Sequence, residues 1–139
     1  MIKERKLTFQ GKPEPQARAR TLKRGITYDP KKDEKNWLKM QALSQWKDEV
    51  LYLPLEIIIT FHMPIPKQTS KSRRALMLDG KIKHSKKPDF DNLAKLTTDA
   101  MEGIVYGNDS QIYKAGIEKI YAEELKTVVT ISWDDKPYR

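Results

Sequence analysis

The 139-residue chain contains no cysteine and only two histidines. The absence of cysteine excludes disulfide bonds, thiolate zinc sites and a cysteine nucleophile, and it fits a reducing compartment. No apolar run approaches the roughly 18 residues that a membrane-spanning helix needs. The N-terminal stretch "MIKERKLTFQ" also lacks the apolar core of a signal peptide. We therefore expect a soluble, cytoplasmic protein with no membrane partner.

Acidic residues are few compared with basic ones. The chain has 27 lysines and arginines against 19 aspartates and glutamates, which gives a formal net charge of +8. Such a charge attracts polyanions at long range, so nucleic acid is the first candidate partner. Many proteins carry basic charge only for solubility, and composition alone leaves both interpretations open.

The length of the chain suits one compact domain, which we place over residues 1–139. A first strand is predicted around Leu7 and Phe9, which alternate with polar neighbours before a glycine and a proline end the pattern. Another strand is predicted from Leu55 to Phe61, where β-branched residues follow one another. We expect this second strand to be central in the sheet.

Two main helices are predicted. Between Pro30 and Tyr52 the apolar residues stand near helical spacing, and we expect Trp37 and Trp46 to lie in the core. From Asp91 to Glu102 the apolar residues recur at i, i+3, i+7 and i+8, and a glycine suited to follow the C-cap comes next. A further short helix is considered in "SKSRRALML".

The last part of the chain predicts two strands, "QIYKAGIEKIYAEE" and "LKTVVTISW". We expect them to form a hairpin that turns near Glu123 and Glu124. The elements then follow the order β-α-β-α-β-β. The predicted fold class is α+β, with one small mixed or antiparallel sheet packed with two main helices.

The basic chain gathers four aspartates in one short stretch: Asp89, Asp91, Asp99 and Asp109. Asp91 can cap the helix that it precedes, because an aspartate there accepts a backbone N–H. It shares one helix face with Lys95 and Asp99, at i, i+4 and i+8, where ordinary exposed ion pairs explain all three. Taken singly, these residues have a structural explanation.

Asp89 and Asp109 are harder to explain in this way. A helix cap needs only one carboxylate, so Asp89 is left over, and an antiparallel return of the chain could bring Asp109 back toward the start of the helix. Three converging carboxylates would suit Mg²⁺, which prefers oxygen ligands, with Mn²⁺ able to replace it. Such an ion can activate a water to cut a phosphodiester. Lys95 could stabilise the developing phosphate charge.

These motifs resemble the RusA family of Holliday junction resolvases. The family's Asp-x-Asp-Asn-Leu-x-Lys run at the start of a helix is matched by residues 89–95, and its Asp-Ala pair by residues 99–100. Its Asp-(Ser/Ala)-Gln-(Val/Ile) turn before a strand is matched by residues 109–112. The stretch "GKPEPQARAR" is similar to the family's N-terminal strand end and basic segment. Residues 88–112 carry the specificity.

The resemblance implies a Mg²⁺-dependent endonuclease that resolves four-way DNA junctions by paired symmetric nicks, in DNA recombination and repair. It implies that Asp89, Asp91 and Asp109 bind the metal and that Lys95 is essential for cleavage. Many members have two acids at the turn, whereas this chain has Asn108, which we expect to supply turn geometry. A four-way junction has two-fold symmetry, which fits a homodimer with one site per subunit.

Two basic clusters flank the acids, and we expect them to contact DNA phosphates. The first comprises Arg18, Arg20, Lys23 and Arg24. The second comprises Lys67, Lys71, Arg73, Arg74, Lys81, Lys83, Lys86 and Lys87. A solubilising surface explains any one of these residues equally well.

Other interpretations stay open. The rival class is a non-catalytic DNA-binding protein whose aspartates are structural. A restriction-type signature can be assembled from Pro88-Asp89 and Glu124-Leu125-Lys126, but such short motifs often arise by chance. His62 and His84 have no partner at ligand spacing; we expect His62 to pack at a strand end and His84 to lie in a solvated loop.

Overall fold

The computed structural model describes residues 1–16, 20–21, 27–28 and 32–136. Its main sheet has four strands in the order β1-β6-β4-β5. Their bounds are Ile2–Gln10 for β1, Leu55–Met63 for β4, Ile112–Tyr121 for β5 and Lys126–Asp134 for β6. Neighbouring strands are antiparallel except β4 and β5, which are parallel. The predicted mixed sheet is confirmed, with β4 in its interior.

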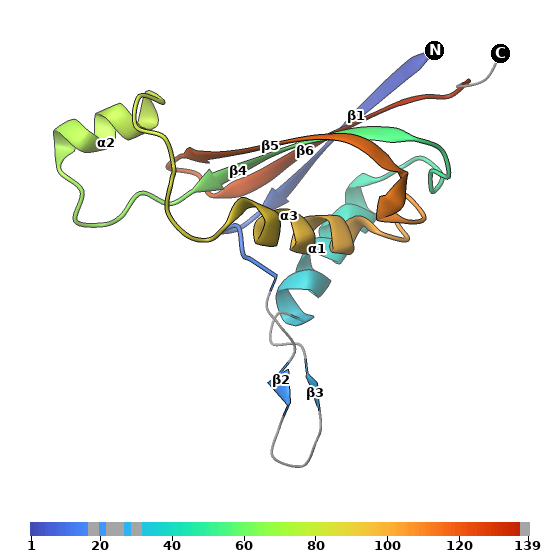
Figure 1. Cartoon of the computed structure of the whole chain (residues 1–139), viewed down its shortest axis with the longest axis horizontal. Helices are drawn as coiled ribbons and strands as arrows, with labels where there is room; N and C mark the ends of the chain where they lie inside the picture. The colour runs from blue at the N-terminus through green and yellow to red at the C-terminus, as the bar shows by residue number, and fades with distance from the viewer. Residues whose placement is uncertain (17–19, 22–26, 29–31, 137–139) are drawn as a thin grey trace.

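Three α-helices accompany the sheet: α1 (Lys32–Gln45), α2 (Lys71–Leu78) and α3 (Phe90–Met101). Figure 1 shows α1 and α3 side by side below the sheet, whereas α2 stands beyond the end where β4 finishes. A separate antiparallel pair is formed by β2 (Arg20–Thr21) and β3 (Thr27–Tyr28). The predicted α+β class and the order β-α-β-α-β-β are confirmed for the main elements, with α2 and the β2–β3 pair added.

The core lies between the sheet and the two helices. Alternate residues of β4 are buried on one face, as the period of two in a strand requires: Leu55, Ile57, Ile59, Phe61 and Met63. They meet Leu93 and Met101 from α3 and Ala42 from α1. The packing of this face fixes which side of α3 is buried and which side remains available to a ligand.

The predicted hairpin is wrong. β5 and β6 are not neighbours, because β4 lies between them and pairs with both. The short connection passes the end of β4, where the N–H of Ala122 donates to the carbonyl of Met63 at 3.0 Å. The physical reason is hydrophobic burial: β4 gains most from an interior position, whereas the lysines and glutamate of β5 suit a sheet edge.

The two tryptophans differ from each other in burial, and the prediction of a core position is confirmed only for Trp46. Trp37 is 52% exposed, so the expectation of a core residue was wrong. Trp46 is 8% exposed and packs in the core just beyond the end of α1, with its ring 5.8 Å from that of Trp133. The two residues are nine positions apart, or about two and a half helical turns, so they point to opposite sides and only one of them can face the sheet.

Candidate active site

α3 carries most of the predicted site residues. Its leucine spacing turns one face inward, where Leu93, Leu96 and Ala100 are buried. Asp91 and Lys95 therefore stand on the outer face, and both are exposed. The same periodicity that makes the helix amphipathic thus places a carboxylate and an ammonium one turn apart, toward solvent.

Asp89, not Asp91, occupies the N-cap position of α3. Its backbone is extended and its carbonyl accepts the N–H of Leu93 at 3.1 Å, but its carboxylate makes no capping hydrogen bond. Asp91 lies within the first helical turn, and its Oδ1 accepts the N–H of Asn92 at 3.0 Å. The prediction that Asp91 is the N-cap was therefore wrong, because Asp89 holds that position. The carboxylate of Asp89 does not cap the backbone N–H groups at the start of the helix.

A cavity of about 430 Å³ adjoins the start of α3. One wall is formed by residues 12–16, which follow β1, and the other by Lys87, Pro88, Asp89 and Asn92. The two walls are joined by the N–H of Gln16, which donates to the carbonyl of Asn92 at 2.8 Å. The residues that line the cavity thus include two lysines, Lys12 and Lys87, and two acids, Glu14 and Asp89.

Lys95 is paired with Asp99. Its Nζ donates to Asp99 Oδ1 at 2.9 Å, with the lysine side chain 54% exposed and the aspartate 18% exposed. Its pKa is raised above the usual lysine value, first by the hydrogen bond to Asp99 and then by the charges of that carboxylate, Asp109 and Glu102. Lys95 is consequently a cation at neutral pH, which suits it to donate to an anionic oxygen and not to act as a general base.

Asp109 begins a short 3₁₀ turn, η1 (Asp109–Gln111), which leads into β5. Asn108 caps this turn: its Oδ1 accepts the N–H of Ser110 at 2.9 Å, while its own N–H donates to Oε1 of Gln111 at 2.8 Å. The expectation that Asn108 supplies turn geometry is confirmed. Gln111 fastens the turn to the rest of the protein by donating to the carbonyls of Leu51 and Leu53.

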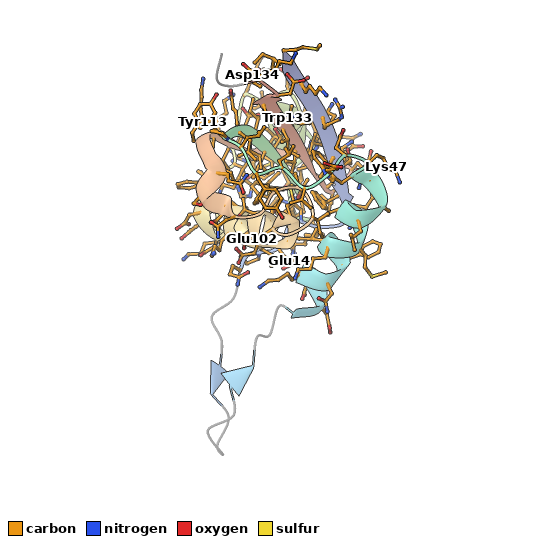
Figure 2. The ribbon with its side chains drawn as sticks, turned by 90° about the vertical axis from the view of Figure 1, so that its right-hand side faces the viewer. Glu14, Lys47, Glu102, Tyr113, Trp133 and Asp134 are labelled. Carbon is orange, nitrogen blue, oxygen red and sulfur yellow. The ribbon has the colours of Figure 1, made fainter. Side chains whose placement is uncertain are left out.

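Glu102 is a neighbour of the site that the sequence interpretation missed. It is the C-cap of α3, and its Oε1 accepts the N–H of Asp109 at 3.3 Å. Figure 2 shows it at the level of the helical layer, well below Trp133 at the end of β6. Lys95, Asp99 and Glu102 are spaced i, i+4 and i+7, so the helical period that grouped the first two could have included the third.

The chain does not return Asp109 to the start of α3, and that expectation was wrong. Asp109 contacts Glu102 just beyond the other end of the helix. Asp89 and Asp109 thus stand at opposite ends of a 12-residue helix, about 18 Å long at 1.5 Å per residue. The strand that runs back along the helix is β5, and its later residue Lys119, not Asp109, reaches the helix start.

The site residues are of the right chemical type for a hard cation but are not grouped as one. Within residues 1–16, 20–21, 27–28 and 32–136, no three acidic or histidine side chains form a group that could hold a metal ion. Mg²⁺ in proteins is commonly held by one or two carboxylates together with waters and substrate phosphates. The exposed carboxylates of this surface could supply the protein ligands of such an ion, and the nearby lysines could hold the phosphates that supply the others.

The basic clusters are described only in part. Arg18, Lys23 and Arg24 and the side chain of Arg20 lie outside the described residues. In the second cluster, all side chains are exposed except that of Arg74, which is partly buried and lies 3.5 Å from Glu123. Lys81 lies 3.5 Å from Asp79. This cluster lines α2 and the segment that leads into α3.

Of the two histidines, only His84 lies at a different depth from the one expected, whereas His62 packs near a strand end as predicted. His84 is partly buried, and its ring lies 4.8 Å from that of Tyr121, so the expectation of a solvated loop residue was wrong. His62 lies within β4, next to its last residue, and is partly buried. Burial is the main cause that lowers the pKa of both imidazoles, so neither ring gains charge at neutral pH.

No helix in the described ranges is long and apolar enough to cross a membrane.

The exposed carboxylates of this face could hold a metal ion of the kind that acts on phosphodiesters, but the geometry alone does not assign the class of protein. Comparison with known families assigns the class: residues 10–132 match the model of the family described as "Endodeoxyribonuclease RusA". The chain belongs to the RusA family and is an endodeoxyribonuclease. It is also similar to the uncharacterized protein YqaN of Bacillus subtilis (strain 168), at 29% identity over 133 residues, covering 91% of this chain and 94% of the relative.

Proposed function

We propose that this endodeoxyribonuclease resolves Holliday junctions by paired symmetric nicks, with Mg²⁺ as its cofactor, in DNA recombination and repair. One observation carries the proposal beyond family membership. The Asp89 carboxylate stands exposed at the start of α3, is not used as a cap, and shares a cavity with Lys12 and Lys87. Such a surface suits DNA with a bound metal ion, because the lysines can contact the phosphates and the carboxylate can contact the metal.

The proposed metal ligands are Asp89, Asp91 and Asp109, and Mn²⁺ is expected to replace Mg²⁺. All three side chains are exposed and offer only oxygen atoms, which is the donor chemistry that these ions take. When bound, the ion supplies positive charge at the phosphate and activates a water for attack. Because Asp89 and Asp109 stand at opposite ends of α3, no single ion can touch both carboxylates as they are placed, so the proposal has two ions, each with a shell completed by DNA phosphates and waters.

The cationic side chains have the other roles. Lys95, held protonated beside Asp99, donates to the phosphate oxygen on which negative charge develops. Lys12 and Lys87 hold the backbone of the DNA at the cavity, and the exposed lysines and arginines of the second basic cluster extend the contact. These contacts orient the strand and do not read its sequence.

A homodimer is the proposed assembly. A four-way junction has two-fold symmetry and is resolved by two cuts, so two copies of the site related by the same symmetry match the substrate. A monomer with one site would cut the two strands in separate binding events. Junctions with a single nick would then accumulate before the resolved duplexes appear.

The decisive test is to map incisions on a synthetic four-way junction, a flap and a plain duplex in the presence of Mg²⁺. The proposal predicts paired symmetric cuts on the junction and little cutting of the duplex. Asp89→Asn should abolish cleavage while junction binding persists or tightens, since a negative charge near phosphate is gone. Glu118→Gln, an exposed acid of β5 away from α3, is the matched control and should cut normally.

Two results would contradict the proposal in different ways. Undiminished cleavage by Asp89→Asn would remove this residue from the metal ligands. Tight junction binding by the wild-type protein, without cleavage under any divalent metal, would favour the rival of a non-catalytic DNA-binding protein.

A further inference from the structure

Lys119 has an unusual place for a lysine. In the register of β5 with β4 it lies opposite Phe61, one of the buried residues that face the helices. A lysine on that face of the sheet must have acceptors for its ammonium protons, since burying an unpartnered charge is costly. An inward-pointing charge on an edge strand can serve merely to prevent association of strands, and this is the simpler explanation to be tested.

The acceptors are two main-chain carbonyls of the segment that leads into α3. Lys119 Nζ donates to the carbonyl of Lys86 at 2.8 Å and to that of Pro88 at 3.0 Å. These carbonyls flank Lys87, and Pro88 immediately precedes Asp89. The lysine therefore ties the sheet to the short stretch that carries two of the cavity-lining residues.

The same stretch is held from its other side. The carbonyl of Asp89 accepts the N–H of Leu93, and the carbonyl of Asn92 accepts the N–H of Gln16. Lys119 supplies the only hydrogen bonds that reach Lys86 and Pro88 from the sheet among the described residues. Without it, the path of the backbone from Lys86 to Asp89 would lack its attachment on the sheet side.

We propose that Lys119 is a positioning residue that sets the place of the Asp89 carboxylate through the carbonyls of Lys86 and Pro88. The inference rests on the proposed function, in which Asp89 binds the metal at the DNA phosphate. A displacement of about 1 Å in a catalytic group can cost about 100-fold in rate, so a main-chain attachment next to Asp89 has a large effect without any contact to DNA.

The test uses the full-length protein with Lys119→Met, which keeps the length of the side chain but removes its donors. Single-turnover cleavage of the four-way junction should slow at least tenfold, and the Mg²⁺ concentration for half-maximal rate should rise. Junction affinity measured with Ca²⁺ in place of Mg²⁺ should stay within about twofold, because the lysine does not contact phosphate in this proposal.

Two further variants separate positioning from other roles. Lys119→Arg can still donate to two carbonyls and should recover most of the rate. Lys114→Met is the matched control on the same strand, where the lysine is exposed and lies 3.9 Å from Glu56; it should behave as the wild type. If Lys119→Met does not fold, Lys119→Gln, whose donor stands one bond closer to the backbone, replaces it in every measurement.

A readout without activity keeps this inference distinct from the proposed function. In the metal-free protein, amide hydrogen exchange of the Lys86 to Asn92 segment should quicken in Lys119→Met and not in Lys114→Met. Unchanged exchange, or a cleavage rate within twofold of the wild type, would overturn the positioning role. Faster exchange in Lys119→Met, together with no junction cleavage by the wild-type protein under any divalent metal, would leave the backbone attachment standing and defeat the proposed function instead.

Discussion

The ammonium of Lys95 lies 2.9 Å from the carboxylate of Asp99, one helical turn further along α3. The lysine that is proposed to meet a phosphate is thus already paired with an acid of its own helix. This contact keeps Lys95 charged and directs it along the outer face of the helix. Substitution of either partner therefore has an expected effect that can be measured.

Asp99→Asn should change the pH dependence of cleavage more than its rate at neutral pH. The carboxylate is the largest cause of the raised pKa of Lys95, so its loss lowers that pKa. A rate that needs the charged lysine falls as pH rises through the pKa, and the alkaline limb of the profile should therefore begin at lower pH in the variant. An alkaline limb identical to that of the wild type would exclude this role for Lys95.

The stability effect of Asp99→Asn should be small. Because the folded-state pKa of Lys95 is raised, the stabilisation is present below the ordinary lysine pKa and is lost as pH rises through the raised one. Exposed pairs at this spacing contribute about 0.3–0.5 kcal/mol. The difference in unfolding free energy between variant and wild type, measured in urea at pH 7, should shrink at higher pH as Lys95 loses its proton.

Lys95→Ala should retain junction binding and lose about 100-fold in single-turnover rate, the scale of removing one pre-placed donor to a developing charge. Junction affinity and single-turnover cleavage measured on the same preparation separate the two effects. Lys114→Ala, which removes a lysine from β5, is the control. Weakened binding with an unchanged rate would instead make Lys95 a phosphate anchor.

Glu102 should act through Asp109, and two substitutions distinguish charge from geometry. In Glu102→Gln an amide oxygen can still accept the N–H of Asp109, so the turn stays in place while a negative charge is lost. In Glu102→Ala both the hydrogen bond to Asp109 and the negative charge are lost. If positioning of Asp109 matters, the alanine variant should need more Mg²⁺ for half-maximal cleavage than the glutamine variant. Equal behaviour of the two would show that charge alone is involved.

Tyr106 supports the C-terminal half of α3 from the core. Its hydroxyl donates to the carbonyl of Thr98 at 2.7 Å, and burial, with the nearby carboxylates adding, raises its pKa far above the usual tyrosine value. The hydroxyl therefore remains a donor at any pH at which the protein is folded. Tyr106→Phe should lower the free energy of unfolding by about 0.5–1.5 kcal/mol in urea titrations.

The matched control for this substitution is Tyr113→Phe, since Tyr113 is exposed on β5. It should leave the free energy of unfolding unchanged within error. A loss in Tyr106→Phe no larger than in Tyr113→Phe would mean that the carbonyl of Thr98 is adequately satisfied by its second donor, the N–H of Glu102.

The sequence predicts best where one periodic pattern determines burial. The run of β-branched residues in β4 and the leucine spacing of α3 were sufficient to place both elements and to give the outer face of α3 to Asp91 and Lys95. The order of strands was not predictable in this way. A short connection between two strands normally indicates a hairpin, and only the competition for the buried centre of the sheet places β4 between β5 and β6.

In the candidate site, too, local patterns identified some residues and could not identify those that depend on the path of the chain. Motif and residue type brought out Asp89, Lys95 and Asp109, whereas Glu102 was missed because its contact is to the backbone of a residue seven positions later. The position of Asp109 depended on the direction in which the chain leaves α3, which no local pattern encodes. The metal ligands themselves remain a prediction that the variants above are designed to test.

The parallel pairing of β4 and β5 has a consequence for how such a site can arise. Parallel neighbours cannot be joined by a tight turn, so the chain must travel the length of the sheet and come back before β5 can begin. Residues 64–111 form that connection, and they include α2, the two carbonyls bound by Lys119, and the acids Asp89, Asp91, Asp99, Glu102 and Asp109. The candidate site is thus built on the crossover connection that the parallel pairing requires, and β5, the strand that the connection reaches, holds the start of α3 in place through Lys119.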